Sequence, residues 1–139
     1  MTKVVCITGG IGAGKTTLSK YLKKNGFLVH ESDKVVAEMY HNPKTSFKKF
    51  LIQNISGEVV ENGKINKKKV SDNIFNNQNN KKKLEKFIHK HVEWSRNNFI
   101  KKNKRNKNKV IFVDIPLLFE NRLEKKFDFN DKDSPSKTL

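Results

Sequence analysis

A run of glycines between an apolar stretch and a helical pattern limits what this chain can fold into more than any other feature. Residues 8–17 read TGGIGAGKTT, with four glycines in the six positions 9–14. An apolar run precedes them at 4–7, and residues 18–22, LSKYL, continue with helical spacing. The segment 9–16 fits G-x-x-x-x-G-K-[ST], a pattern that needs a strand before it and a helix after it. The sequence therefore predicts a phosphate-binding loop.

The residue types in this loop explain how it would bind a nucleoside triphosphate. Glycines let successive backbone N–H groups curl around phosphate oxygens, and the following helix adds its positive N-terminal end. We expect Lys15 to reach the β- and γ-phosphates as a catalytic residue, and the Thr16 hydroxyl to hold the Mg²⁺ that accompanies ATP. The predicted ATP-binding residues are Gly12, Ala13, Gly14, Lys15, Thr16 and Thr17.

The patterns on either side of the loop predict an α/β fold with a parallel sheet. Residues 3–8 predict a buried strand, 16–25 a helix and 27–30 a second strand, which together make a βαβ unit. A third buried strand is predicted at 110–113. Residues from about 34 to 108 between the last two strands show mainly helical spacing, so we interpret them as a helical lobe inserted into the sheet.

Within this lobe, one long helix and one turn are the clearest signals. Apolar residues recur at intervals of three and four from Leu84 to Val92, which predicts a helix that extends to about Phe99. The polar residues 101–109 fit a loop, and Asn62-Gly63 is a turn signal.

Composition narrows the classes of function. The 139 residues suffice for one modest domain, and the net charge of +16 comes almost entirely from lysine. Lysine and asparagine are abundant while arginine is rare, which favours a solvated surface over a nucleic-acid site, because the planar arginine fork matches phosphate better.

The expected location is the cytoplasm. The apolar stretch at the N-terminus is too short for a secretory signal, and no run approaches the roughly 18 apolar residues of a membrane span. Cys6 is the single cysteine and lies in a predicted buried strand, which indicates a reduced core thiol.

Two carboxylates follow the second and third strands, at the sheet edge where the loop lies. Asp33 is placed to accept a proton from a hydroxyl that attacks the γ-phosphate, or to cap a helix, and the two roles are compatible. Asp114 is either an acid near Mg²⁺ or a strand-end turn residue. Glu120 could face the same site or cap the next helix.

Five motifs, in the right order over residues 1 to about 128, resemble the dephospho-coenzyme A kinase family. The opening ITGGIGAGKTT is similar to the family's loop, and Glu31-Ser32-Asp33 resembles its D-A-D. Residues 62–67 resemble D-G-x-(I/L)-(D/N)-R, and 84–89, after Ile74-Phe75, resemble L-E-x-I-I-H. Residues 114–120, DIPLLFE, resemble the family's P-L-L-x-E element.

The resemblance implies a three-layer P-loop NTPase sandwich of the nucleotide-kinase type, with the helical insertion as the substrate lobe. It implies that ATP, with Mg²⁺, phosphorylates the 3′-hydroxyl of dephospho-CoA to give CoA and ADP, the last step of coenzyme A synthesis. Asp33 would be the catalytic base or the orienting carboxylate. The substrate-binding residues it implies are Asp33, His89, Pro116, Leu118 and Glu120.

This sequence departs from the family pattern at single positions and at its end. Glu31, Ala37, Lys67 and Lys90 stand where the family has Asp, Arg or His, Arg and Pro. The resemblance ends near residue 128, whereas the family continues with a further strand, an arginine-bearing lid, a terminal helix and the adenine pocket. We therefore expect a kinase domain over 1–128, a disordered tail over 129–139 and a shortened chain without the C-terminal strands and lid. Since such arginines are worth ~10³–10⁵ in rate, their loss could abolish activity or folding.

Two other functions are compatible with the sequence. One is another P-loop nucleoside or nucleotide kinase, and the other is a basic nucleic-acid-binding protein with a vestigial loop. The main interpretation has ATP and dephospho-CoA as partners, with no specific nucleic acid and no membrane, and it leaves the oligomeric state open.

Overall fold

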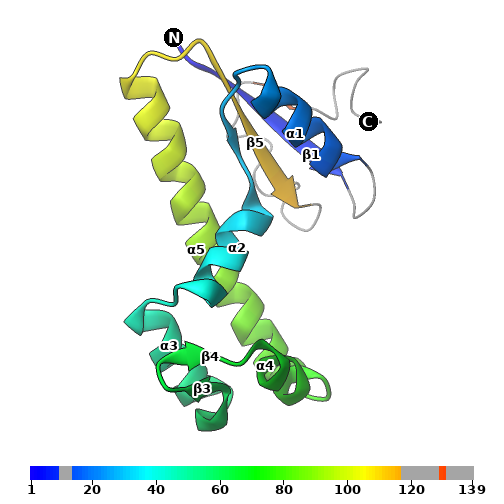
Figure 1. Ribbon diagram of the computed structural model, residues 1–139, viewed down its shortest axis with the longest axis vertical. Coiled ribbons are helices and arrows are strands. Elements are labelled where there is room, and N and C mark those ends of the chain that lie inside the picture. Colours follow the sequence, from blue (N-terminus) through cyan, green and yellow to red (C-terminus); the bar gives the residue numbers. More distant parts are fainter. Residues whose placement is uncertain (10–13, 117–128, 131–139) are drawn as a thin grey trace. The chain divides into compact units, whose positions relative to one another are not determined.

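The structure is a computed structural model that describes residues 1–9, 14–116 and 129–130 (Figure 1). The chain divides into two compact units. Unit 1 comprises Met1–Ser32 and Ser95–Leu139, and unit 2 comprises Asp33–Trp94. The long helix α5 (Gln78–Arg105) contributes residues to both units.

Within the described residues, unit 1 contains a parallel sheet of four strands in the order β2-β5-β1-β6. Its strands are β1 (Lys3–Gly9), β2 (Val29–His30), β5 (Val110–Pro116) and β6 (Phe129–Asn130). β1 and β5 run side by side from the Lys3–Val110 pair to the Gly9–Pro116 pair. Their carboxyl ends therefore finish at the same edge of the sheet, as the sequence predicted for a parallel fold.

The fourth strand was not predicted from the sequence. Phe129 and Asn130 pair with Val5 and Cys6 of β1, although they fall in the segment predicted to be a disordered tail. Two residues are too few to show the alternation that marks a strand, so this pairing depends on contact with a distant part of the chain. The remainder of that segment, 131–139, lies outside the described residues.

The two faces of the sheet are covered by different helical elements. Five buried residues, together with Phe99 and Ile100 of α5, form the core on one face: Val4, Cys6, Ile111, Val113 and Ile115. Alternation along the strands places Ile7 and Phe112 on the opposite face, where α1 (Lys15–Lys24) contacts β1 and β2. Cys6 is a buried free thiol, as predicted.

Unit 2 is mainly helical (Figure 1). It contains most of α2 (Ser32–His41), then α3 (Thr45–Asn54), a 3₁₀ turn (Gly57–Val59), the strands β3 (Val60–Glu61) and β4 (Lys64–Ile65), α4 (Lys67–Ile74) and the first part of α5. β3 and β4 pair antiparallel around Asn62 and Gly63, whose φ angles are 52° and 75°. The Asn-Gly turn predicted from the sequence is therefore confirmed.

Unit 2 has its own hydrophobic core. Six buried residues from four helices and the 3₁₀ turn form it: Met39, Phe47, Leu51, Val59, Val70 and Leu84. Phe87 of α5 stacks on Phe50, with ring centroids 4.4 Å apart, and on Phe47 at 5.4 Å. The helical spacing from Leu84 onward thus marks a buried face, as predicted.

The long helix extends further than the sequence indicated. We predicted a loop over 101–109, but α5 continues to Arg105. Asn103 is 3 % exposed, and its carbonyl accepts a hydrogen bond from the Thr2 hydroxyl at 3.4 Å, so the last turns pack within unit 1. Lysine and arginine near the end also suit the negative C-terminal end of a helix.

Candidate nucleotide and substrate site

The strand and the helix that a phosphate-binding loop requires lie on either side of the glycine run. β1 ends at Gly9 and α1 begins at Lys15, so the glycine run joins them. Gly14 precedes the helix with a φ of 80°, a left-handed conformation that glycine adopts without strain. Among the described residues, no side chain caps α1, and its first turn contains no acidic residue. Its first N–H groups and positive end therefore suit an anionic ligand such as a nucleotide phosphate.

The predicted ATP-binding residues fall partly within this described segment. Lys15 is the first residue of α1 and is partly buried, while Thr16 and Thr17 are exposed in its first turn. Gly12 and Ala13 lie outside the described residues.

The register of the sheet brings the P-L-L-x-E element to the start of the loop. Pro116, the last residue of β5, pairs with Gly9, the last residue of β1. This element and the glycine run therefore begin at adjacent positions on one edge of the sheet. The other two residues predicted from this element, Leu118 and Glu120, lie outside the described residues.

Asp114 connects the carboxyl ends of β5 and β2. Its side chain is on the face opposite the α5-covered core, and the residue is 4 % exposed. Asp114 Oδ1 accepts a hydrogen bond from the Ser32 backbone N–H at 2.8 Å, and the Asp114 carbonyl accepts one from the Ser32 hydroxyl at 3.0 Å. Asp114 lies within β5 rather than in a turn, so the turn interpretation of this residue is wrong.

Asp33 follows Ser32 directly and lies in the first turn of α2. Because the helix begins at Ser32, Asp33 lies inside the first turn, and the interpretation of Asp33 as a helix cap is wrong. The positive end of α2 stabilises a carboxylate at this position, and Asp33 is exposed.

The remaining predicted substrate residue, His89, is on α5 within unit 2 and is half-buried. The glycine loop, Ser32, Asp114 and Pro116 belong to unit 1, whereas Asp33 and His89 belong to unit 2.

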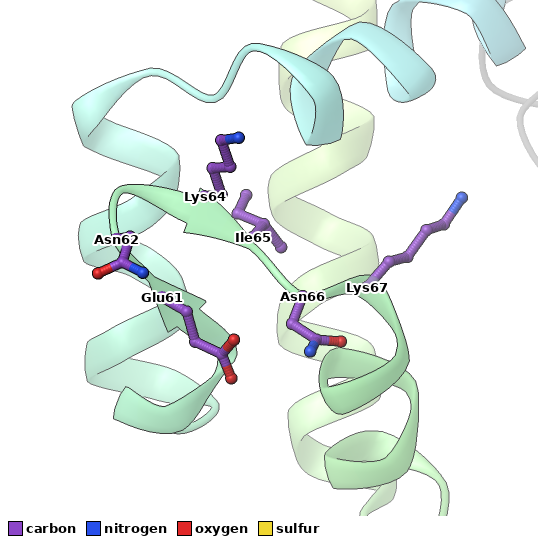
Figure 2. A pocket seen from close by; sticks show the side chains of 6 residues that line it. All are labelled: Glu61, Asn62, Lys64, Ile65, Asn66 and Lys67. Atoms are coloured by element: carbon purple, nitrogen blue, oxygen red, sulfur yellow. The ribbon is translucent and has the colours of Figure 1, made fainter.

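A pocket of about 500 Å³ lies in unit 2 at the β3–β4 hairpin and the start of α4 (Figure 2). The residues lining it are Glu61, Asn62, Lys64, Ile65, Asn66 and Lys67. The Asn66 side chain caps α4 by accepting the Lys69 N–H at 3.1 Å, and Glu61 forms an ion pair with Lys69. Glu61, by hydrogen bonding, raises the pKa of Lys69. The Glu61 carboxylate is thus paired with Lys69. The other two charged residues of the lining, Lys64 and Lys67, are positive and suit an anionic group.

Lys67 of this pocket stands where the resembling family has an arginine. Its ammonium lies 5.2 Å from the centroid of the Tyr40 ring, in a cation–π arrangement. Burial raises the pKa of Tyr40, so this phenol stays neutral at physiological pH. The lysine is therefore held by an aromatic face of α2 at the edge of the pocket.

His30 and Ser32 make contacts near the candidate site that the sequence did not predict. The His30 ring Nε2 lies 3.0 Å from the Ser95 hydroxyl, and the ring lies 5.4 Å from that of Phe99. Burial, and then the charge of Arg96, lowers the pKa of His30 to about 4. Ser32 was visible in the sequence only as the middle residue of a motif, and its partner is 82 positions away.

Residues 1–9, 14–116 and 129–130 contain no group of three or more His, Cys, Asp or Glu side chains arranged to hold a metal ion. The predicted role of Thr16 concerns a metal that arrives with ATP, and the uncapped start of α1 fits such a nucleotide. None of the described helices is long and apolar enough to cross a membrane.

Comparison with known proteins identifies the relatives of this chain. A family model described as dephospho-CoA kinase matches residues 3–129. The dephospho-CoA kinase of Fusobacterium nucleatum is 37% identical over 124 residues, which cover 88% of this chain and 61% of that protein. The dephospho-CoA kinase of Bartonella quintana is 35% identical, over 91% of this chain and 63% of that protein. This chain thus spans less than two thirds of the length of these curated relatives.

Solved structures show the same similarity. The dephospho-CoA kinase of Campylobacter jejuni is 25% identical with a TM-score of 0.73, over 93% of this chain and 65% of that one. A crystal structure from Thermus thermophilus is 26% identical with a TM-score of 0.67, over 93% of this chain and 63% of that one. These neighbours confirm the predicted α/β fold of the P-loop kinase type. Because the family model matches nearly the whole sequence, this chain belongs to the dephospho-CoA kinase family.

Proposed function

We propose that this chain transfers the γ-phosphoryl group of ATP to the 3′-hydroxyl of dephospho-CoA, giving CoA and ADP. The observation that carries the proposal is that α1 begins at Lys15, directly after the glycine run, in a chain of the dephospho-CoA kinase family. Proteins named dephospho-CoA kinase in Fusobacterium nucleatum and Bartonella quintana support the substrate.

In this proposal the glycine loop holds the ATP phosphates. Residues 12–17 supply backbone N–H groups, and Lys15 binds the β- and γ-phosphate oxygens. The Thr16 hydroxyl would hold Mg²⁺, which would neutralise phosphate charge. The negative charge that spreads over the transferring group thus meets fixed positive groups at the start of α1.

Asp33 acts on the acceptor side of the reaction. Its carboxylate accepts the proton of the 3′-hydroxyl as that oxygen attacks the γ-phosphorus and the bond to the β-phosphate oxygen breaks. His89, Pro116, Leu118 and Glu120 are proposed to contact dephospho-CoA.

The proposal places the chain in the cytosol with small molecules as its partners. The buried free thiol of Cys6 fits a reducing compartment. The lysines of the hairpin pocket fit a substrate that carries phosphates.

The test is ADP release from purified chain with Mg-ATP, measured with and without dephospho-CoA. The Lys15→Ala variant should lose roughly 10²–10³-fold in kcat, as expected for removal of a group that stabilises transition-state charge. Lys20→Ala, at an exposed position on the same helix, is the matched control and should match the unmodified chain.

Three other outcomes would change the assignment. ADP release that needs a nucleoside or nucleotide in place of dephospho-CoA would reassign the acceptor. Release that persists in Lys15→Ala would remove the loop from the mechanism. A folded chain that releases no ADP with any acceptor would contradict the proposed activity.

A further inference from the structure

We propose that Asp114 is a positioning residue that fixes the start of α2, and with it Asp33, rather than a ligand of Mg²⁺. The inference rests on the proposed function, because Asp33 is the base only in that reaction. It concerns the segment that leaves β2 and enters α2, which contains the Glu31-Ser32-Asp33 motif.

The contacts of Ser32 are those of a helix cap supplied by another strand. Ser32 is the first residue of α2, so its N–H is one of the donors that has no partner inside the helix. The Asp114 carboxylate accepts this N–H at 2.8 Å, a charge-assisted hydrogen bond at the positive end of the helix. Capping normally uses a side chain just before the helix, whereas here a side chain of β5 accepts this N–H.

The second bond makes the connection a clamp. The Ser32 hydroxyl donates to the Asp114 carbonyl at 3.0 Å, so one residue is held by both the side chain and the backbone of the other. Both residues are nearly inaccessible to solvent, at 2 % and 4 % exposure. Two bonds between the same pair of buried residues fix the orientation of the Ser32 peptide, and the backbone of Asp33 continues directly from it.

This clamp, the two Ser32–Asp114 hydrogen bonds, lies just beyond the last residue pair of β2 and β5. β2 has two residues, and its pairing with β5 ends at His30 opposite Val113. Ser32 and Asp114 are therefore the next tie beyond the last strand pair. His30, the last residue of β2, is held to α5 through its ring Nε2, which lies 3.0 Å from the Ser95 hydroxyl. The exit of β2 is thus fixed from β5 and from α5 before the chain reaches Asp33.

The same geometry argues against a metal ligand. Asp114 Oδ1 is directed at a backbone N–H, and the residue is buried next to Ser32. An oxygen that binds Mg²⁺ must face the nucleotide and its waters. A hydrogen-bond acceptor needs only the oxygen, whereas Mg²⁺ is held more weakly by a neutral amide oxygen than by a carboxylate. This difference separates the two roles experimentally.

The experiment compares Asp114→Asn, which keeps an acceptor oxygen and loses the charge, with Asp114→Leu, which loses both. We expect Asp114→Leu to lower kcat by roughly 10²-fold, the effect of misplacing a catalytic group by about 1 Å, with an unchanged KM for ATP. Asp114→Asn should recover most of this loss and keep the dependence of the rate on Mg²⁺ concentration. If Asp114→Asn is as slow as Asp114→Leu and needs more Mg²⁺, Asp114 is a metal ligand and the proposal is wrong.

A double-mutant cycle tests whether Asp114 acts through Asp33. In an Asp33→Asn background, Asp114→Leu should cause little further loss of kcat, because the group that it positions is already absent. A full additional loss would show that Asp114 has a separate role. If Asp114→Leu does not fold, Ser32→Ala replaces it in both comparisons, since it removes only the hydroxyl bond and should give a smaller loss of the same kind.

Amide hydrogen exchange tests the clamp without catalysis. In the full chain, the amide of Ser32 should exchange slowly in the unmodified protein and in Asp114→Asn, and faster in Asp114→Leu. Equal exchange in all three would overturn the clamp even if the enzyme is active. An unmodified chain with no turnover would instead overturn the proposed function, and with it the part given to Asp33, while exchange would still show whether Asp114 holds Ser32.

Discussion

At the scale of single residues, His30 makes the stability of unit 1 depend on pH. The pKa of His30 is lowered from 6.5 to about 4, first by burial and then by the charge of Arg96, with a smaller opposing effect from Glu31. Between these two values the unfolded chain binds more protons than the folded one. The stability that is fully present above pH 6.5 is therefore lost as the pH falls towards 4.

Between about pH 7 and pH 4.5, we expect protonation of His30 to lower the free energy of unfolding by roughly 2 kcal/mol. Urea denaturation at several pH values measures this fall. His30→Gln, which cannot titrate, should be less stable at pH 7 but should lose less stability on acidification. An equally steep pH dependence in the variant would assign the effect to other groups.

Residues close together in the sequence were predicted better than residues brought together by folding. The spacing of Gly14, Lys15 and Thr16 is local, so the loop and its helix could be predicted. The hydrogen bond between Ser32 and Asp114 joins positions 82 apart, and no local sequence pattern around either residue indicates it. The sequence could place both residues at strand ends, but not show which oxygen meets which N–H.

At the scale of elements, the β3–β4 hairpin depends on the backbone of its turn. Gly63 has a φ of 75° and no atoms crowd the position of a Cβ, so a substitution there is opposed by conformation alone. Gly63→Ala should destabilise the protein by about 1–2 kcal/mol, the cost of a left-handed conformation for a residue with a Cβ.

Gly57 provides the matched control for this prediction. It also has open space around a Cβ, but its φ is not positive. Gly57→Ala should therefore be neutral or stabilise by about 0.4–1 kcal/mol, because alanine restricts the unfolded chain. Urea unfolding of both variants gives the comparison, and equal effects would mean that the turn conformation does not limit stability.

The helices of unit 2 are held by their buried faces rather than by their exposed ones. Leu51 and Ile52 are neighbours on α3, yet Leu51 is 0% exposed in the core and Ile52 is 48% exposed. Leu51→Ala should cost about 2–5 kcal/mol, whereas Ile52→Ala should stay within about 0.5 kcal/mol of the unmodified chain. Thermal unfolding followed by circular dichroism measures both, and a large loss in Ile52→Ala would show that this exposed face is covered.

The sequence predicted these elements well where periodicity was long, and poorly where it was short. The apolar repeat that begins at Leu84 identified α5, but the repeat fades after Phe99 while the helix continues to Arg105. Packing of Phe99, Ile100 and Asn103 extends the helix beyond the range where local pattern is informative. β6 is the extreme case, because a strand of two residues exists only through its partner.

At the scale of the whole molecule, the net charge of +16 draws all polyanions to the surface, and not only the nucleotide. The two compact units have different cores, but lysines are spread along both. Dispersed lysines neutralise phosphates but make no base-specific contacts. The affinity for nucleic acid should therefore depend on salt concentration and not on base sequence.

We therefore expect duplex DNA to bind this chain only non-specifically, with a Kd of about 10⁻⁴–10⁻⁶ M at physiological salt. Fluorescence anisotropy with two unrelated duplexes, at about 50 mM and about 200 mM salt, should show equal affinities that fall steeply with salt. Lys15→Ala should bind DNA as the unmodified chain does, because one lysine among many contributes little. Binding that is tight for one duplex and survives at the higher salt would instead make a nucleic acid the ligand of this protein. An ATP site does not distinguish one DNA sequence from another. Sequence-specific DNA binding would therefore come from another surface, and the phosphate-binding loop would be vestigial.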